Sequence, residues 1–128
     1  MVISTDDGLE HVADLIQDSV DTIAIGTGST TETQTDSSLE NEEYRASVGA
    51  SNVSVVDLSG SGVLYQLNIK GGTQVAGGTQ IQEIGLFADA DGDGTAETLV
   101  VRDTFGIKEI TSGRFSTFEI ELPVENGA

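Results

Sequence analysis

The spacing of apolar residues changes once along the chain, from a helical period to a strand period. Over residues 5–18, the apolar positions Leu9, Val12, Ala13 and Ile16 fall on one stripe of a helix. A threonine and two aspartates at the start of this segment suit a helix cap and the positive end of the helix dipole. The pattern therefore predicts one short N-terminal α-helix over residues 5–18.

Beyond this segment, apolar and polar residues alternate, as in strands with one buried face. The alternation is clearest over residues 63–69 and 118–124, and Pro123 in the second run indicates an edge strand or a strand end. Shorter apolar runs occupy residues 22–25, 53–58, 84–87 and 99–101. The pattern predicts a single, mainly β domain over residues 1–128, an antiparallel β-sandwich of six to eight strands, with a barrel as the alternative.

The run IGLF at residues 84–87 has apolar side chains on both faces of its strand. Ile84 and Leu86 point to one face, and Phe87 points to the other. A strand that is apolar on both faces is buried on both sides. We therefore expect this strand to lie in the core and beneath a neighbouring subunit.

The net charge of the chain limits the kinds of molecule that we expect it to bind. The chain carries 22 acidic residues against 5 basic ones, a formal net charge of -17. Repulsion from phosphates and from anionic lipids argues against nucleic-acid binding and against a membrane-surface partner. At molar salt the screening length falls to about 3 Å, so this charge no longer opposes folding. The composition is typical of a protein from a high-salt cytoplasm; a cation-binding or simply very soluble surface is the alternative.

The sequence lacks the features expected of disulfide-bonded, secreted and membrane-spanning proteins. The chain has no cysteine, so we expect no disulfide and no thiolate metal site. The first twenty residues have no basic flank and no long apolar core, so we expect no signal peptide. No run approaches the ~20 apolar residues that span a bilayer, so we expect no membrane insertion.

The stretch IAIGTG has two glycines, Gly26 and Gly28, directly after an apolar run, as phosphate-binding loops do. A P-loop requires a lysine directly after its last glycine, whereas the nearest downstream lysine here is Lys70. A dinucleotide fingerprint requires a third glycine, and Thr31 occupies that position. Residues 23–45 are therefore interpreted as a strand, a projecting loop and a return segment, in which Arg45 pairs within an acidic block.

No group of residues has catalytic spacing. His11 is the only histidine and lies off the apolar stripe of the predicted helix, and the chain has neither GxSxG nor a cysteine nucleophile. Carboxylate pairs recur because the whole chain is acidic, so they give no specific acid–base signal. We expect a protein that is not an enzyme, with no catalytic and no cofactor-binding residues; a metal-assisted hydrolase is the alternative.

One segment, DADGDGTAE at residues 89–97, matches the first half of a calcium-binding loop. The candidate ligands are Asp89, Asp91, Asp93, Thr95 (through its backbone carbonyl) and Glu97. The twelfth position is Val100, so the bidentate glutamate of such loops is missing. Two interpretations stay open, a site for Ca²⁺ or another hard cation and a solvated Asp- and Gly-rich hairpin turn.

Several short segments occur in an order that resembles one family. IAIGTG is followed by a Thr/Ser-rich loop and LENEEYR, and much later come IQEIGLF, an acidic turn and VVRDTFG. In this order and spacing, over residues 8–110, the chain is similar to small proteins and N-terminal modules from the tail-fibre and baseplate gene clusters of tailed viruses. The acidic turn is longer here than in that family.

The resemblance implies a structural component of a virion, assembled in the host cytoplasm and forming a symmetric homo-oligomer that contacts other virion proteins. A trimer would suit a tail fibre or baseplate, and a pentamer would suit a capsid vertex. A capsid decoration or vertex turret protein and a module that binds the host cell surface, as an adhesin does, are the alternatives. Together with the acidic composition, the resemblance implies a virus of a halophilic archaeon.

Overall fold

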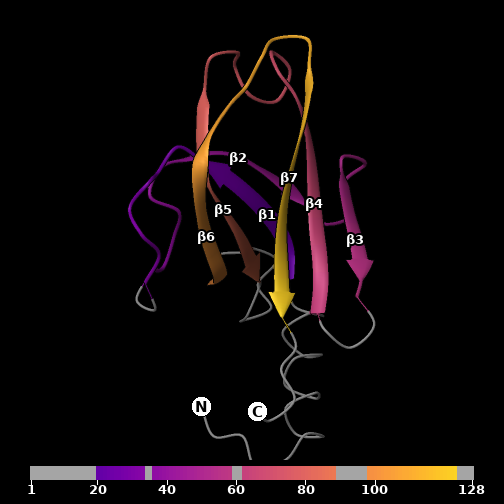
Figure 1. The fold of residues 1–128 in the computed structure, drawn as a ribbon. Helices are drawn as coiled ribbons and strands as arrows, with labels where there is room; N and C mark the ends of the chain where they lie inside the picture. Colours follow the sequence, from indigo (N-terminus) through magenta and orange to yellow (C-terminus); the bar gives the residue numbers. More distant parts are fainter. Residues whose placement is uncertain (1–19, 34–35, 59–61, 89–97, 124–128) are drawn as a thin grey trace, which may run out of the picture.

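The computed structural model describes residues 20–33, 36–58, 62–88 and 98–123. Within these ranges the chain forms seven strands (Figure 1). They are β1 (Val20–Gly26), β2 (Glu42–Ser47), β3 (Val53–Asp57), β4 (Gly62–Lys70), β5 (Gln80–Ala88), β6 (Thr98–Glu109) and β7 (Phe115–Pro123). The helix predicted over residues 5–18 lies outside the described residues.

The strands form two antiparallel sheets. One has the order β2-β1-β5-β6 and the other the order β3-β4-β7, and in Figure 1 the three-stranded sheet lies in front. The prediction of a mainly β, antiparallel fold is confirmed. β7, which contains Pro123, is an edge strand, as the proline indicated, because a residue without an N–H cannot donate to a second neighbouring strand. In the part of the chain that the structure describes there is no helix, and so none that is long and apolar enough to cross a membrane.

A common hydrophobic core lies between the two sheets. The alternation in β4 decides which side chains enter it, since Tyr65, Leu67 and Ile69 are buried while Asn68 and Lys70 are exposed. β5 and β7 contribute in the same way. The cluster joins both sheets through Ile23, Ile25, Ile84, Leu86, Val63, Tyr65, Leu67, Ile69, Phe118 and Ile120, among others. Burial of these side chains is the main force that holds the sheets together.

The second face of β5 is also buried, but by the chain itself. Phe87 points away from the common core and forms a small second cluster with Ala24, Leu39 and the partly buried Leu99. Leu39 belongs to the connection between β1 and β2, which folds back over the outer face of the four-stranded sheet. The two apolar faces of β5 predicted a covering subunit; that prediction is wrong for this face, because a segment distant in sequence supplies the cover.

Candidate functional site

The connection between β1 and β2 is the most heavily hydrogen-bonded loop that the structure describes. We call residues 27–33 and 36–41 the anchored loop. β1 and β2 are antiparallel neighbours, paired from Thr22 opposite Ser47 to Gly26 opposite Glu42. The loop therefore leaves and re-enters the sheet at the same end, between a strand and a return segment as the sequence pattern predicted.

A single carboxylate ties both ends of the anchored loop to the sheet. The side chain of Glu83, on β5, has no exposed surface. Its Oε2 accepts hydrogen bonds from the backbone N–H groups of Gly28 and Asn41, each at 2.8 Å. Its Oε1 accepts one from the backbone N–H of Glu40 at 2.8 Å and one from Arg102 Nε at 2.9 Å. Four donors thus converge on one carboxylate, and three of them are loop backbone groups.

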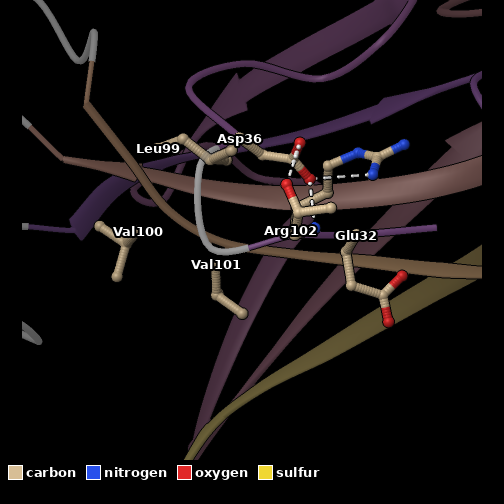
Figure 2. Close-up of a pocket in the computed structure, with 7 residues that line it drawn as sticks. Glu32, Asp36, Leu99, Val100, Val101 and Arg102 are labelled. Atoms are coloured by element: carbon tan, nitrogen blue, oxygen red, sulfur yellow. Dashed lines mark hydrogen bonds and ion pairs between the residues drawn. The ribbon is translucent and has the colours of Figure 1, made fainter. Parts of the chain in front are cut away.

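Arg102, on β6, holds the middle of the anchored loop. Its side chain is 3% exposed, and its Nη1 donates to the carbonyl oxygen of Thr30 at 2.9 Å and to Asp36 Oδ2 at 3.2 Å. Figure 2 shows the Asp36 carboxylate and the Arg102 guanidinium turned toward each other. Among the described residues, Arg102 Nη2 is the one buried side-chain nitrogen or oxygen without a hydrogen-bond partner. Arg102 Nε is bonded to Glu83, and its Nη1 is bonded to the loop.

Gly26 and Gly28 make room for the carboxylate. A Cβ on Gly28 would stand 2.5 Å from Glu83 Oε2 and would also strike the Cβ of Glu40. A Cβ on Gly26 would stand 2.6 Å from the same oxygen and would strike the backbone oxygen of Asn41. The two glycines of IAIGTG are therefore required by a buried glutamate of the same chain.

The remaining acids of the anchored loop accept hydrogen bonds from the loop itself or from the neighbouring strand β6. Glu40 accepts bonds from the backbone N–H of Ser29 and from Thr30, and Asp36 accepts bonds from the N–H and hydroxyl of Thr33 at 2.9 and 3.1 Å. The hydroxyl of Thr104 in β6 donates to Glu32 at 2.5 Å. The Thr/Ser- and acid-rich composition of the loop therefore serves its own hydrogen bonding.

Electrostatics keep Glu83 ionised. Burial raises the pKa of the Glu83 carboxyl, but hydrogen bonds from the N–H groups of Asn41, Glu40 and Gly28 and from Arg102 outweigh burial, so the pKa is lowered overall. Four donors occupy the ionised carboxylate, and three of them are backbone groups of the anchored loop. The buried pair therefore positions the loop.

The lowered pKa of Glu83 predicts acid sensitivity with a definite sign. The ionised carboxylate stabilises the fold above the unfolded-state pKa of about 4.3, and this contribution is lost as pH falls through the lower folded-state pKa. We expect the difference in free energy of unfolding between wild type and Glu83→Gln to be constant near neutral pH and to shrink below about pH 4.3. Urea unfolding of both proteins in molar KCl measures this difference in free energy, at pH values from roughly 3 to 7, which lie on both sides of the usual glutamate pKa. A difference that stays constant down to the lowest pH would contradict this assignment.

Arg102 lines two cavities. One, of about 340 Å³, is also lined by Leu99, Val100 and Val101 of β6 and by loop residues that include Glu32 (Figure 2). The other, of about 320 Å³, is lined by loop hydroxyls and carboxylates. Each cavity is lined by a threonine hydroxyl that donates to a carboxylate, Thr33 to Asp36 in the first and Thr30 to Glu40 in the second. In the described ranges no three His, Cys, Asp or Glu residues are grouped to hold a metal ion.

The candidate calcium ligands Asp89, Asp91, Asp93, Thr95 and Glu97 all lie in residues 89–97, outside the described residues. The strands on either side are described: β5 and β6 are antiparallel neighbours, and Ala88 pairs with Thr98. The segment therefore connects two paired strands, which is the context of the hairpin-turn interpretation. Binding of Ca²⁺ or another hard cation stays a prediction.

The prediction for Arg45 is confirmed. Its Nε and Nη2 donate to the two carboxylate oxygens of Glu42 at 2.8 and 2.7 Å, and its guanidinium lies 4.7 Å from the ring centroid of Phe87.

The sequence pattern did not single out Glu83 or Arg102. Glu83 interrupts the apolar run IQEIGLF and Arg102 directly follows the apolar run LVV, and a charge next to such strand residues is the signal by which a buried pair could have been found.

No known family profile and no curated protein sequence matches this chain.

Proposed function

We propose that this protein is a structural component of a tailed-virus virion, forming a symmetric homo-oligomer in the tail, baseplate or fibre assembly. The observation that carries the proposal is that the segments resembling the tail-fibre and baseplate family meet at one place. Gly28 comes from IAIGTG, Glu40 and Asn41 from LENEEYR, Glu83 from IQEIGLF and Arg102 from VVRD. Segments separated by up to about 70 residues of sequence form one hydrogen-bonded unit.

What this unit does physically supports a structural role. Its charged groups are used in fixing a loop to a sheet, and a loop held at both ends and in the middle presents a fixed surface to a partner. We further propose that the two sheets form a β-sandwich to which residues 5–18 add a short helix. The acidic composition supports assembly in a high-salt cytoplasm and a halophilic archaeal host.

The aromatic residues favour the structural role over an adhesin. A glycan-binding adhesin needs an exposed aromatic platform on which a sugar ring can stack. All six aromatic residues of this chain are described, and only Phe115, at 74%, is largely exposed. Tyr65, Phe87 and Phe118 are 2–3% exposed. One isolated ring offers little area for sugar recognition.

The native mass in molar KCl tests the proposed function. We expect a stable trimer by light scattering, because fibres and baseplates are built on closed symmetry. A pentamer would favour a capsid vertex protein instead. A monomer at micromolar concentration would contradict the homo-oligomer.

The same measurement with EDTA tests the predicted cation site at residues 89–97. Dissociation or unfolding on adding EDTA, reversed by Ca²⁺ and abolished in Asp91→Ala, is the result expected of a structural ion. An unchanged mass and an unchanged melting temperature would leave the segment as a hairpin turn.

A further inference from the structure

The five basic residues of this chain fall into two groups. Arg45 and Arg102 each form ion pairs with carboxylates of the chain itself. Lys70, Lys108 and Arg114 have no ion-pair partner among the described residues, although the chain carries 22 acids. The second group therefore has charge that the described part of the fold does not use.

Two connections form one end of the molecule, residues 71–79 between β4 and β5 and residues 110–114 between β6 and β7, drawn at the top of Figure 1. Hydrogen bonds join the two connections. The N–H of Gly71 donates to the carbonyl oxygen of Arg114, and the N–H of Gly113 donates to the carbonyl oxygen of Gly71, each at 2.9 Å. These segments, far apart in sequence, therefore make one surface.

The three cations without ion-pair partners gather at this end, and all three are exposed. Arg114 directly precedes Phe115, which pairs with Lys70 in the register of β4 and β7. The Nζ of Lys70 lies 5.8 Å from the ring centroid of Phe115. The Nζ of Lys108 donates to the carbonyl oxygen of Thr117, two residues further along β7, at 2.6 Å.

Few acids oppose these cations. We call residues 70–80 and 107–117 the basic end; they hold three of the five basic residues and one of the 22 acids, Glu109, for a formal charge of +2. The rest of the chain has a formal charge of -19. The next acid along β7 is Glu119, which pairs with Gln66 of β4. The basic end is thus opposite in sign to the chain as a whole.

An exposed aromatic ring lies beside the cations. Phe115 is 74% exposed, more than any other large apolar side chain that the structure describes. Aromatic and arginine side chains are enriched where proteins contact one another. A ring next to cations fits a partner that offers carboxylates together with an apolar side chain.

We propose that the basic end is a docking surface for an acidic segment of another protein in the assembly. Carboxylates of that segment bind Lys70, Lys108 and Arg114, and an apolar side chain between them covers Phe115. The proposal rests on the proposed function, since it names a class of partner for that virion component. Charge complementarity supports it, because the rest of the chain, at -19, repels carboxylates and the basic end attracts them.

A short protein segment fits this surface better than nucleic acid does. A nucleic acid carries phosphates along its whole length, and these would also approach the acidic rest of the chain. A protein segment can place a few carboxylates on the basic end and continue with neutral residues elsewhere.

Binding of a labelled synthetic peptide to the full chain tests the proposal. The probe is a peptide of glutamates around a central leucine, and the comparison peptide has glutamine in place of every glutamate. By fluorescence anisotropy we expect saturable binding of the glutamate peptide, which weakens as the KCl concentration rises because salt screens the ion pairs. No saturable binding, or equal binding of the glutamine peptide, would overturn the proposal.

Reversing one charge locates the binding surface. We expect Arg114→Glu to weaken binding of the glutamate peptide at least about tenfold, because it sets like charges against each other. The matched control is Arg45→Glu, which makes the same change of charge on β2, at a cation already paired with Glu42, and should leave binding nearly unchanged. Circular dichroism checks the fold of both variants. Equal weakening would mean that the peptide responds to net charge alone, and the basic end would not be the docking surface.

Replacing Phe115 by alanine tests the apolar part of the contact. The side chain is 74% exposed, so the fold should tolerate the change, and we expect weaker binding of the glutamate peptide with an unchanged dependence on KCl. Unchanged affinity would remove the ring from the proposed contact.

Two further measurements identify other occupants of the basic end. If a labelled oligothymidine binds as tightly as the glutamate peptide, the surface binds any polyanion and the proposal is wrong. If Arg114→Glu lowers the native mass of a wild-type oligomer, a second copy of the chain occupies the basic end, which also contradicts the proposal.

The outcomes separate this proposal from the proposed function. A wild-type oligomer that does not bind the glutamate peptide refutes the docking surface, and the homo-oligomer still stands. A wild-type monomer that binds the peptide through Arg114 refutes the homo-oligomer, and the docking surface still stands.

Discussion

Replacing Glu83 by glutamine is expected to lower the free energy of unfolding by about 3–5 kcal/mol, the usual cost of breaking a buried ion pair from one side. The variant keeps the shape of the side chain but leaves the buried guanidinium of Arg102 without its buried counter-ion. It also converts one of the two acceptor oxygens into an amide donor that faces loop N–H groups. Since small domains have about 5–15 kcal/mol of stability in all, the loss would be a large part of the total.

The matched control is Glu42→Gln, which breaks the ion pair of Glu42 with Arg45. The geometry of that pair is as good, with an N–O distance of 2.7 Å, but its side chains are 44% and 31% exposed. Exposed pairs contribute about 0–1 kcal/mol, so the control should be nearly neutral. Urea unfolding of the three proteins in the same molar KCl buffer measures both effects. Equal losses in the two variants would show that burial of Glu83 has no special role.

A double variant separates the contribution of the ion pair to stability from the contribution of the hydrogen bonds that anchor the loop. Replacing a buried pair by apolar residues of similar volume is often nearly neutral. Here Glu83→Leu with Arg102→Met would still leave the N–H groups of Gly28, Glu40 and Asn41 without an acceptor. Each unsatisfied buried N–H costs about 1–3 kcal/mol, so we expect the double variant to remain strongly destabilised. Full recovery would mean that the loop does not depend on the carboxylate.

Replacing Gly28 by alanine is expected to cost about 3 kcal/mol, which combines overpacking with a weakened charge-assisted hydrogen bond. The new Cβ would strike Glu40 and would stand 2.5 Å from Glu83 Oε2, so the loop or the buried carboxylate has to move. Movement of either lengthens the 2.8 Å bond from the Gly28 N–H to Glu83. Differential scanning calorimetry in molar KCl would detect the loss as a lower melting temperature.

Gly49→Ala is the control for this variant. A Cβ at Gly49 meets no atom within 4 Å, so the only expected effect is a small stabilisation, about 0.4–1 kcal/mol, from the stiffer unfolded chain. A Gly28→Ala protein as stable as Gly49→Ala would contradict the close packing of the loop against Glu83.

The alternation of side chains in β4 and β7 could be predicted from the sequence, because a strand with one buried face repeats every two residues. Val63–Ile69 and Phe118–Leu122 follow that rule with few exceptions. The ion pair between Arg45 and Glu42 could also be predicted, since its partners are three residues apart. Local spacing is sufficient for features of this kind.

The Glu83–Arg102 pair could not be predicted from local spacing. Its partners are 19 residues apart on neighbouring strands, and the loop groups that they hold are up to 72 residues away. Which charge is buried depends on which strands become neighbours and on which segment covers them. For the same reason, the apolar outer face of β5 predicted a second subunit where the structure places Leu39 of the same chain.

The sequence by itself therefore determined the strand class and the edge position of β7, because these depend on residue type and short-range period. Only the tertiary structure decided that two glycines, a loop and the Glu83–Arg102 pair form one unit. Long-range pairing sets this result, and no period in the chain encodes which strands will meet.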